Sequence, residues 1–212
     1  MRIEERYAHI LDWFRQHMPS AESELRYDNP YQLLVAVILS AQCTDKRVNM
    51  TTPALFDRFP TPQHMAEADP EEIYPYIKSI SYPNNKAKNL SGMARMLVSE
   101  FGGQVPSDID QLQRLPGVGR KTANVVAIVA FHQSAMPVDT HVFRVSDRLG
   151  LTTGAKTPLQ TEMQLNPRRG PACGPPLADS ARPLRLHGPQ AALRGMRTKT
   201  VVSLLRAVRG KK

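Results

Sequence analysis

The chain has 212 residues, 41% of them hydrophobic, which is enough to bury an apolar core in one or two compact domains. Two cysteines, Cys43 and Cys173, cannot build a disulfide framework or a four-thiolate metal site, and they suit a reducing compartment. The N-terminus carries no apolar signal segment and no later stretch approaches a membrane span, so we expect a cytoplasmic protein.

The formal charge of +9 is concentrated in the last part of the chain. Residues 166–212 hold eight Arg and three Lys against a single acid, Asp179, so residues 1–165 are close to neutral. The same tail has six Pro, five Gly and no aromatic residue, and its opening run, residues 166–171, shows no amphipathic period, although residues 200–208 could form a short helix or strand. Any DNA affinity of residues 1–165 must therefore come from a local site, since the net charge alone proves nothing.

Apolar residues in the first 165 positions recur at helical spacing, and we see no convincing strand. Four helix starts are predicted where a capping residue precedes a proline: Asn29-Pro30, Thr61-Pro62, Asp69-Pro70 and Thr157-Pro158. Ser107, with Asp110 three residues later, resembles a further start. The run 31–39 is apolar nearly all round, which predicts a buried central helix. The pattern indicates an all-α protein.

A helix, a tight turn and a second helix are predicted around Leu115-Pro116-Gly117-Val118-Gly119-Arg120-Lys121-Thr122. Two glycines one residue apart permit a sharp turn, and the N-terminus of the next helix offers N–H donors and a positive dipole end to a phosphate. A Walker-type loop is disfavoured because Arg120 stands before Lys121 and a helix precedes the turn. An ordinary helix–helix turn with a solvated lysine remains an alternative.

Two segments resemble the signatures of one enzyme family. Residues 115–126 resemble the helix-hairpin-helix signature of the endonuclease III family of DNA glycosylases, and residues 138–145 resemble its second signature. Further similarity covers residues 33–49 and 76–90, so the resemblance runs through about residues 1–165. It implies a two-lobed helical glycosylase fold, with one lobe over residues 22–133 and the other from residues 1–21 and 134–165, and a DNA site between them. Residues 166–212 form an atypical tail that we expect to be poorly ordered.

The resemblance also implies a catalytic pair and a bifunctional activity. Lys121 matches the amine that attacks the sugar carbon bearing a damaged base, forms an imine and permits β-elimination. A lysine attacks only when its amine is unprotonated, a form that desolvation and a neighbouring cation such as Arg120 favour. Asp139 matches the acidic partner, although an Asp at this place is also an ordinary helix N-cap, and the two roles can coexist.

Several further residues are expected to contact DNA. The family uses a glutamine and an apolar residue to fill the gap left by the extruded nucleotide, at the positions of Gln42 and Tyr82. A plain polar residue at a helix end is the alternative for Gln42, and the run around Tyr82 departs from the commoner family pattern. His141 is interpreted as structural or phosphate-contacting. The remaining predicted DNA contacts are Leu115, Gly117, Val118, Gly119, Arg120 and Thr140.

The tail departs from the family. Most members carry a C-x6-C-x2-C-x5-C cluster that holds a [4Fe–4S] group, whereas Cys173 is the single cysteine of this tail. We therefore expect no cofactor and no metal. The expected partner is double-stranded DNA with damaged or abasic sites, bound by a monomer in the cytoplasm at the nucleoid, without a membrane. The alternatives are a non-catalytic helix-hairpin-helix remnant that only binds DNA, and a glycosylase that only removes the base.

We hypothesise that the reading frame is lost near Asn166, because charge, aromatic content and periodicity all change where the family likeness ends. A divergent tail that binds DNA through its charge is the alternative. Translating the other two frames downstream of codon 165 should reveal a family tail with spaced cysteines. Two frames without such cysteines would rule the hypothesis out.

Overall fold

The computed structural model of the chain describes residues 2–17, 24–133 and 135–165. These residues form ten α-helices and no strand, which confirms the all-α prediction. None of the helices in the described ranges has the length and apolar character needed to cross a bilayer.

The expectations for the tail, including Cys173, concern residues outside those described. The chain divides into two compact units, one from Met1–Glu22 with Ser134–Lys212 (the terminal unit) and one from Ser23–Gln133 (the hairpin unit).

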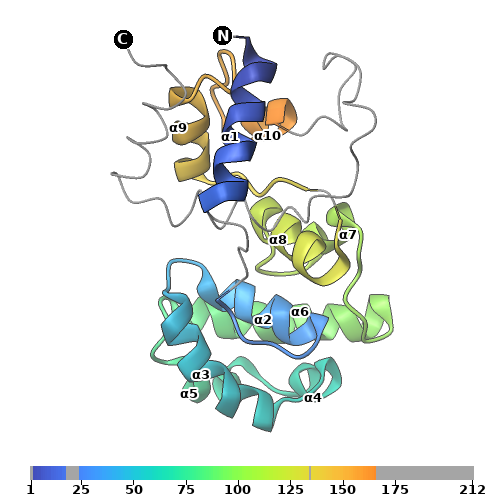
Figure 1. Cartoon of the computed structure of the whole chain (residues 1–212). Helices are drawn as coiled ribbons and strands as arrows, with labels where there is room; N and C mark the ends of the chain where they lie inside the picture. Colours follow the sequence, from blue (N-terminus) through green and yellow to red (C-terminus); the bar gives the residue numbers. More distant parts are fainter. Residues whose placement is uncertain (1, 18–23, 134, 166–212) are drawn as a thin grey trace. The chain divides into compact units, whose positions relative to one another are not determined.

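The hairpin unit is built around one apolar helix (Figure 1). This helix, α2, is buried from Leu33 to Leu39 and packs against α3, α6 and α8, which confirms the predicted central helix. Helices α3, α4 and α5 cover one side of the α2 and α6 pair, and α7 and α8 lie on the other. The helices are α2 (Pro30–Ser40), α3 (Asp45–Arg58), α4 (Pro62–Glu67), α5 (Pro70–Ile77), α6 (Pro83–Phe101), α7 (Ile109–Arg114) and α8 (Arg120–Phe131).

The helix starts follow the capping signals in the sequence. Helices α2, α4, α5 and α10 (Pro158–Leu165) begin at the four predicted prolines. The side chain of Asn29 accepts a hydrogen bond from the backbone N–H of Gln32, as a helix N-cap does. A helix start is also present where Ser107 predicted one, but the N-cap of α7 is Asp108, one residue later. Its Oδ1 accepts hydrogen bonds from the backbone N–H groups of Asp110 and Gln111 at 3.0 and 2.9 Å.

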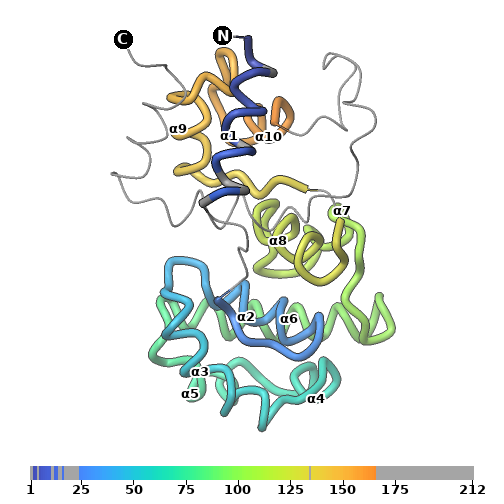
Figure 2. Tube along the Cα trace, viewed as in Figure 1, coloured from blue at the N-terminus to red at the C-terminus, as the bar shows by residue number. Residues whose placement is uncertain are grey.

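The terminal unit combines both ends of the described chain. It contains α1 (Ile3–His17), α9 (Thr140–Arg148) and α10 (Figure 2). Ile10 of α1 and Leu165 of α10 share one apolar cluster with Val142 and Val145 of α9. Arg6 also donates a hydrogen bond to the carbonyl oxygen of Gly150 at 3.0 Å. Residues far apart in sequence therefore form a separate core that holds the start of α9.

Truncating the central helix should destabilise the hairpin unit. Leu34 of α2 has no solvent-exposed surface, so Leu34→Ala would leave a cavity and lower the free energy of unfolding by about 2–5 kcal/mol. Val98→Ala on α6 is the control, because Val98 is 38% exposed and its truncation should cost less than about 0.5 kcal/mol. Urea unfolding monitored by circular dichroism measures both. Equal effects of the two substitutions would contradict a core centred on α2.

Candidate functional site

The predicted hairpin is present, and its apolar residues anchor it. The turn between α7 and α8 is closed by a hydrogen bond from the N–H of Val118 to the carbonyl of Leu115 at 3.0 Å. Leu115 and Val118 are buried, whereas Gly117 and Gly119 are exposed. The apolar pair therefore fixes the turn to the core of the hairpin unit and leaves the two glycines on the surface.

The two glycines serve different purposes. Gly117 has a φ of +78°, and a Cβ added there would lie 2.9 Å from the Cβ of Asn89 on α6. Gly119 has a φ of −82°, which any residue can adopt, and a Cβ added there would meet nothing within 4 Å. Gly117 is thus required by the backbone and by the contact with α6. Gly119 leaves open space in front of α8.

The N-terminus of α8, like that of α6, lacks the capping hydrogen bond from its N-cap side chain that several other helices of the described chain have. Gly119 is its N-cap and supplies no side-chain hydrogen bond, whereas Asn29, Thr44 and Asp108 each cap their helices with a side-chain acceptor. The positive end of a helix dipole lies at its N-terminus, and open space surrounds the Cα of Gly119, an arrangement that suits an anion. Lys121, half-buried, lies in this first turn.

Gln42 and Tyr82 were predicted from separate segments, and the structure brings their loops together. Gln42 follows α2 and Tyr82 precedes α6, and Ser81 Oγ donates a hydrogen bond to the carbonyl of Gln42 at 2.8 Å. Both residues are exposed, and both have left-handed backbones, with φ of 55° and 57°. They therefore form one exposed feature of the hairpin unit.

Asp139 caps α9 in the terminal unit. Its Oδ1 accepts hydrogen bonds from the N–H groups of His141 and Val142 at 3.0 and 2.8 Å, so the capping role is confirmed. Thr140 is exposed at the start of α9, and His141 is half-buried. The Nε2 atom of His141 is buried and has no hydrogen-bond partner among the described residues. Asp139, Thr140 and His141 thus belong to the terminal unit, whereas the other predicted site residues belong to the hairpin unit.

Two residues next to the predicted site were missed by the sequence analysis. Lys86 of α6 is only 6% exposed, and its Nζ donates to the carbonyls of Leu39 and Ala41 at 2.9 and 2.6 Å. Burial lowers the pKa of Lys86, and the nearby Cys43 acts in the opposite direction. Ser81 is the other missed residue. A signal for Lys86 existed, since it stands one helical turn before buried Leu90 on the apolar face of α6.

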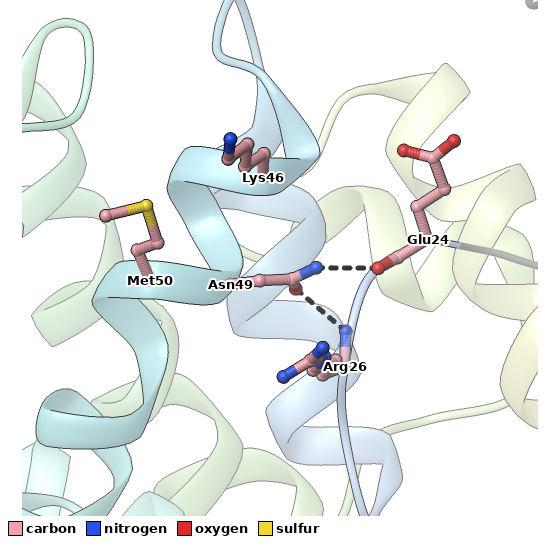
Figure 3. Close-up of a pocket in the computed structure, with 5 residues that line it drawn as sticks. All are labelled: Glu24, Arg26, Lys46, Asn49 and Met50. Carbon is pink, nitrogen blue, oxygen red and sulfur yellow. Dashed lines mark hydrogen bonds between the residues drawn. The ribbon is translucent and has the colours of Figure 1, made fainter.

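An open pocket lies beside α3 at the start of the hairpin unit (Figure 3). Asn49 donates from Nδ2 to the carbonyl of Glu24 at 2.7 Å, and its Oδ1 accepts from the N–H of Arg26 at 2.9 Å. Arg26, Lys46 and Met50 complete the lining with Glu24 and Asn49. None of the predicted site residues lines this pocket, whose geometry follows from how Asn49 holds residues 24–26 against α3.

Residues 35–168 match the family model described as HhH-GPD superfamily base excision DNA repair protein, and the chain belongs to this family. Endonuclease III of Bacillus subtilis (strain 168) is 48% identical over 155 residues, which are 73% of this chain and 71% of that protein. Endonuclease III of Synechocystis sp. is 50% identical over 162 residues, 76% of this chain and 74% of that one. The E. coli (strain K12) endonuclease III is 44% identical, over 68% of this chain and 69% of its own.

Solved structures agree with the family. A trapped endonuclease III–DNA covalent intermediate matches with a TM-score of 0.73 at 45% identity, over 78% of each chain. A non-covalent endonuclease III–DNA complex matches with a TM-score of 0.70 at 37% identity, over 92% of this chain and 98% of that one. The helical fold with a helix-hairpin-helix motif, first expected from sequence, is therefore confirmed.

The two glycines of the hairpin should be separable by mutation. Gly117→Ala should destabilise the protein by about 1 kcal/mol or more, because its backbone is left-handed and Asn89 occupies the space of the new Cβ. Gly119→Ala should cost less stability, since its backbone is ordinary and its surroundings are open. It should instead weaken binding to duplex DNA, because the methyl group fills the space in front of α8. Unfolding curves and DNA titrations of both variants test this, and normal DNA binding by a folded Gly119→Ala protein would contradict the role given to that space.

Proposed function

We propose that Lys121 is the nucleophile of this protein and Asp139 its acidic partner. The chain is a DNA glycosylase and abasic-site lyase of base excision repair, as its family and its endonuclease III relatives establish. The observation that supports Lys121 is its place in the first turn of α8, whose N-cap is Gly119, a residue without a capping side chain. A phosphate accepted there would hold the DNA backbone beside the amine.

In the proposed reaction, the damaged nucleotide is first extruded from the duplex. The unprotonated Nζ of Lys121 attacks C1′ of the sugar, and the bond from C1′ to the base breaks, with its electron pair leaving on the base. Loss of the proton from the attached nitrogen and opening of the sugar ring give an imine between Lys121 and C1′. Removal of a C2′ proton then expels the 3′ phosphate by β-elimination, and water releases the lysine.

Asp139 is proposed to accept the proton from Lys121 and to stabilise positive charge that develops on the sugar. The two cap bonds to Oδ1 support this role, because they fix the orientation of the carboxylate. Capping α9 and accepting a proton are therefore compatible functions of one side chain. Thr140 and His141 follow directly in α9 and are proposed to contact DNA.

Within the hairpin unit, the backbone donors around Gly117, Val118 and Gly119 are proposed to hold a phosphate without reading sequence. Leu115 supports this turn from the core, and Arg120 adds positive charge at its edge. Gln42 and Tyr82 are proposed to fill the gap in the base stack. Their exposure and their adjoining loops support this assignment.

We further propose that this chain works without a [4Fe–4S] cluster. Such a cluster is held by four cysteine thiolates, and the two cysteines of the whole chain cannot supply them, so the residues present do not fit that group. The reaction proposed above uses the side chains of the protein alone. We propose that it acts as a monomer on damaged or abasic double-stranded DNA in the cytoplasm, at the nucleoid.

Borohydride trapping tests the nucleophile. Sodium borohydride reduces an imine to a stable amine, so wild-type protein mixed with abasic duplex DNA should give a covalent adduct, and Lys121→Ala should give none. Lys88→Ala is the matched control, because Lys88 is an exposed lysine of α6 and should leave the adduct unchanged. DNA binding without any adduct in the wild type would favour the non-catalytic remnant, and base release with an intact strand would favour a base-only glycosylase.

The same assay separates the two functions of Asp139. Asparagine is as good an N-cap as aspartate, so Asp139→Asn should leave the unfolding free energy within about 0.5 kcal/mol of the wild type. It lacks the carboxylate, so the rate of adduct formation should fall by about 100-fold or more. A stable Asp139→Asn protein with a normal trapping rate would remove Asp139 from the proposed mechanism.

A further inference from the structure

Two strained residues stand on neighbouring exposed loops of the hairpin unit. Among the described residues other than glycine, only Gln42, Tyr82 and His132 have positive φ angles. Gln42 and Tyr82 lie in the left-handed region although both carry a Cβ, and Tyr82 is 63% exposed. Such a conformation persists where surrounding contacts impose it, and strained residues of this kind concentrate at functional sites.

The contacts that surround these residues come from two side chains. Ser81, which directly precedes Tyr82, donates from Oγ to the carbonyl of Gln42 at 2.8 Å. Lys86, one turn further along α6, donates to the carbonyl of Ala41, which directly precedes Gln42, at 2.6 Å. These two hydrogen bonds thus join the loop of Gln42 to the loop of Tyr82 at or next to the strained residues.

Lys86 is an unusual residue to find in this place. It is only 6% exposed, and burial lowers its pKa, so it is unfavourable to bury unless its polar group is satisfied. Its Nζ reaches the carbonyls of Leu39 and Ala41, where the negative end of the α2 dipole lies. Lys86 therefore acts as a C-terminal cap of α2 that is supplied by another helix.

A second set of contacts supports the same junction from the other side. Arg47 of α3 donates to the carbonyl of Ser79 at 3.1 Å, and the hydroxyls of Thr51 and Ser79 lie 3.3 Å apart. The segment before Tyr82 is thus attached to α3 as well as to the loop of Gln42. The loop after α2 and the loop before α6 form one braced unit.

We propose that Lys86 and Ser81 are positioning residues that hold Gln42 and Tyr82 as a preformed wedge, which enters the base stack of duplex DNA when the damaged nucleotide is extruded. This inference rests on the proposed function, in which Gln42 and Tyr82 fill that gap. A wedge that is formed before DNA binds does not lose conformational entropy on binding, so it enters the duplex at lower cost.

Helix α6 also connects the wedge to the turn between α7 and α8. The contact between Asn89 and Gly117 lies seven residues after Tyr82, about 10 Å along the helix. A single helix therefore carries the wedge at its N-terminus and, about two helical turns further along, contacts the turn that is proposed to hold a phosphate. Both contacts with DNA are set at a fixed spacing by α6.

Binding to a stable abasic analogue tests the proposal without any chemical step. The probe is a duplex that contains one tetrahydrofuran nucleotide, compared with the same strand alone, because only the duplex has a stacked gap for the wedge to fill. Lys86→Met keeps the apolar stem of the side chain and removes both hydrogen bonds. Its Kd for the duplex should rise about tenfold, while its Kd for the single strand should change less than about twofold. Lys88→Met, at the exposed lysine of the same helix, should change neither.

Three further variants separate positioning from general stability. Lys86→Arg, which retains charge and donors, should restore part of the duplex preference. In a Gln42→Ala background, Lys86→Met should have little additional effect, since the wedge is already lost. Ser81→Ala removes one surface hydrogen bond and should raise the duplex Kd about threefold. If Lys86→Met does not fold, the Ser81→Ala result alone tests the proposal.

The outcomes distinguish this proposal from the proposed function. A folded Lys86→Met or Ser81→Ala protein with the wild-type ratio of duplex to single-strand affinity would overturn the proposal that Lys86 and Ser81 hold the wedge. This includes an equal loss of affinity for both probes, which would indicate a merely structural role. Failure of the Lys121 mechanism would appear separately, as wild-type protein that binds the analogue normally but forms no borohydride adduct with abasic DNA.

Discussion

The packing of α6 against the turn between α7 and α8 fixes the geometry on which the site depends. Gly117 sits against Asn89 with no room for a side chain, and a Cβ added at Gly92 would lie only 3.3 Å from the Cγ of Pro116. The turn is therefore held against a long helix that also contacts α4, α5 and α2. Because protein interiors resist deformation, the turn that is proposed to hold a phosphate shares the rigidity of the whole hairpin unit. A surface loop thus gains the precision that a binding site requires.

A second constraint lies at the end of α2. A helix that is buried all round must leave the core with its last carbonyls satisfied, and here no glycine follows it to allow an easy left-handed cap. Gln42 takes the left-handed position instead, and Lys86 supplies donors to the last carbonyls from α6. This way of ending α2 leaves Gln42 strained and exposed on the surface. Gln42 is therefore both the residue that ends the helix and one of the residues proposed to contact DNA.

Helix N-termini divide into two kinds in the described chain. Most begin with a side chain that accepts hydrogen bonds from the first turn, as Asp139 does for α9. Helix α8 begins with Gly119 and has no such side-chain acceptor, so its first turn is suited to an acceptor that comes from outside the protein. The cap that stabilises α9 orients a carboxylate, and the N-cap of α8, a glycine without a capping side chain, stands where we propose that a phosphate binds. Capping chemistry, ordinarily a matter of stability, thus defines both halves of the proposed catalytic pair.

The sequence by itself determined the helices, because local rules govern them: prolines after Asn29 and Thr61 mark helix starts, and apolar periodicity marks the buried faces. It also determined the hairpin and its lysine, since those residues are contiguous. Only the tertiary structure decided that Ser81 and Lys86 tie two loops together. Ser81 contacts Gln42 and Lys86 contacts Leu39, and these pairs, separated in sequence by 39 and 47 positions, meet through packing that no local pattern encodes. It likewise separated Gly117 from Gly119, since the difference lies in Asn89, a neighbour that becomes visible only when α6 folds against the turn.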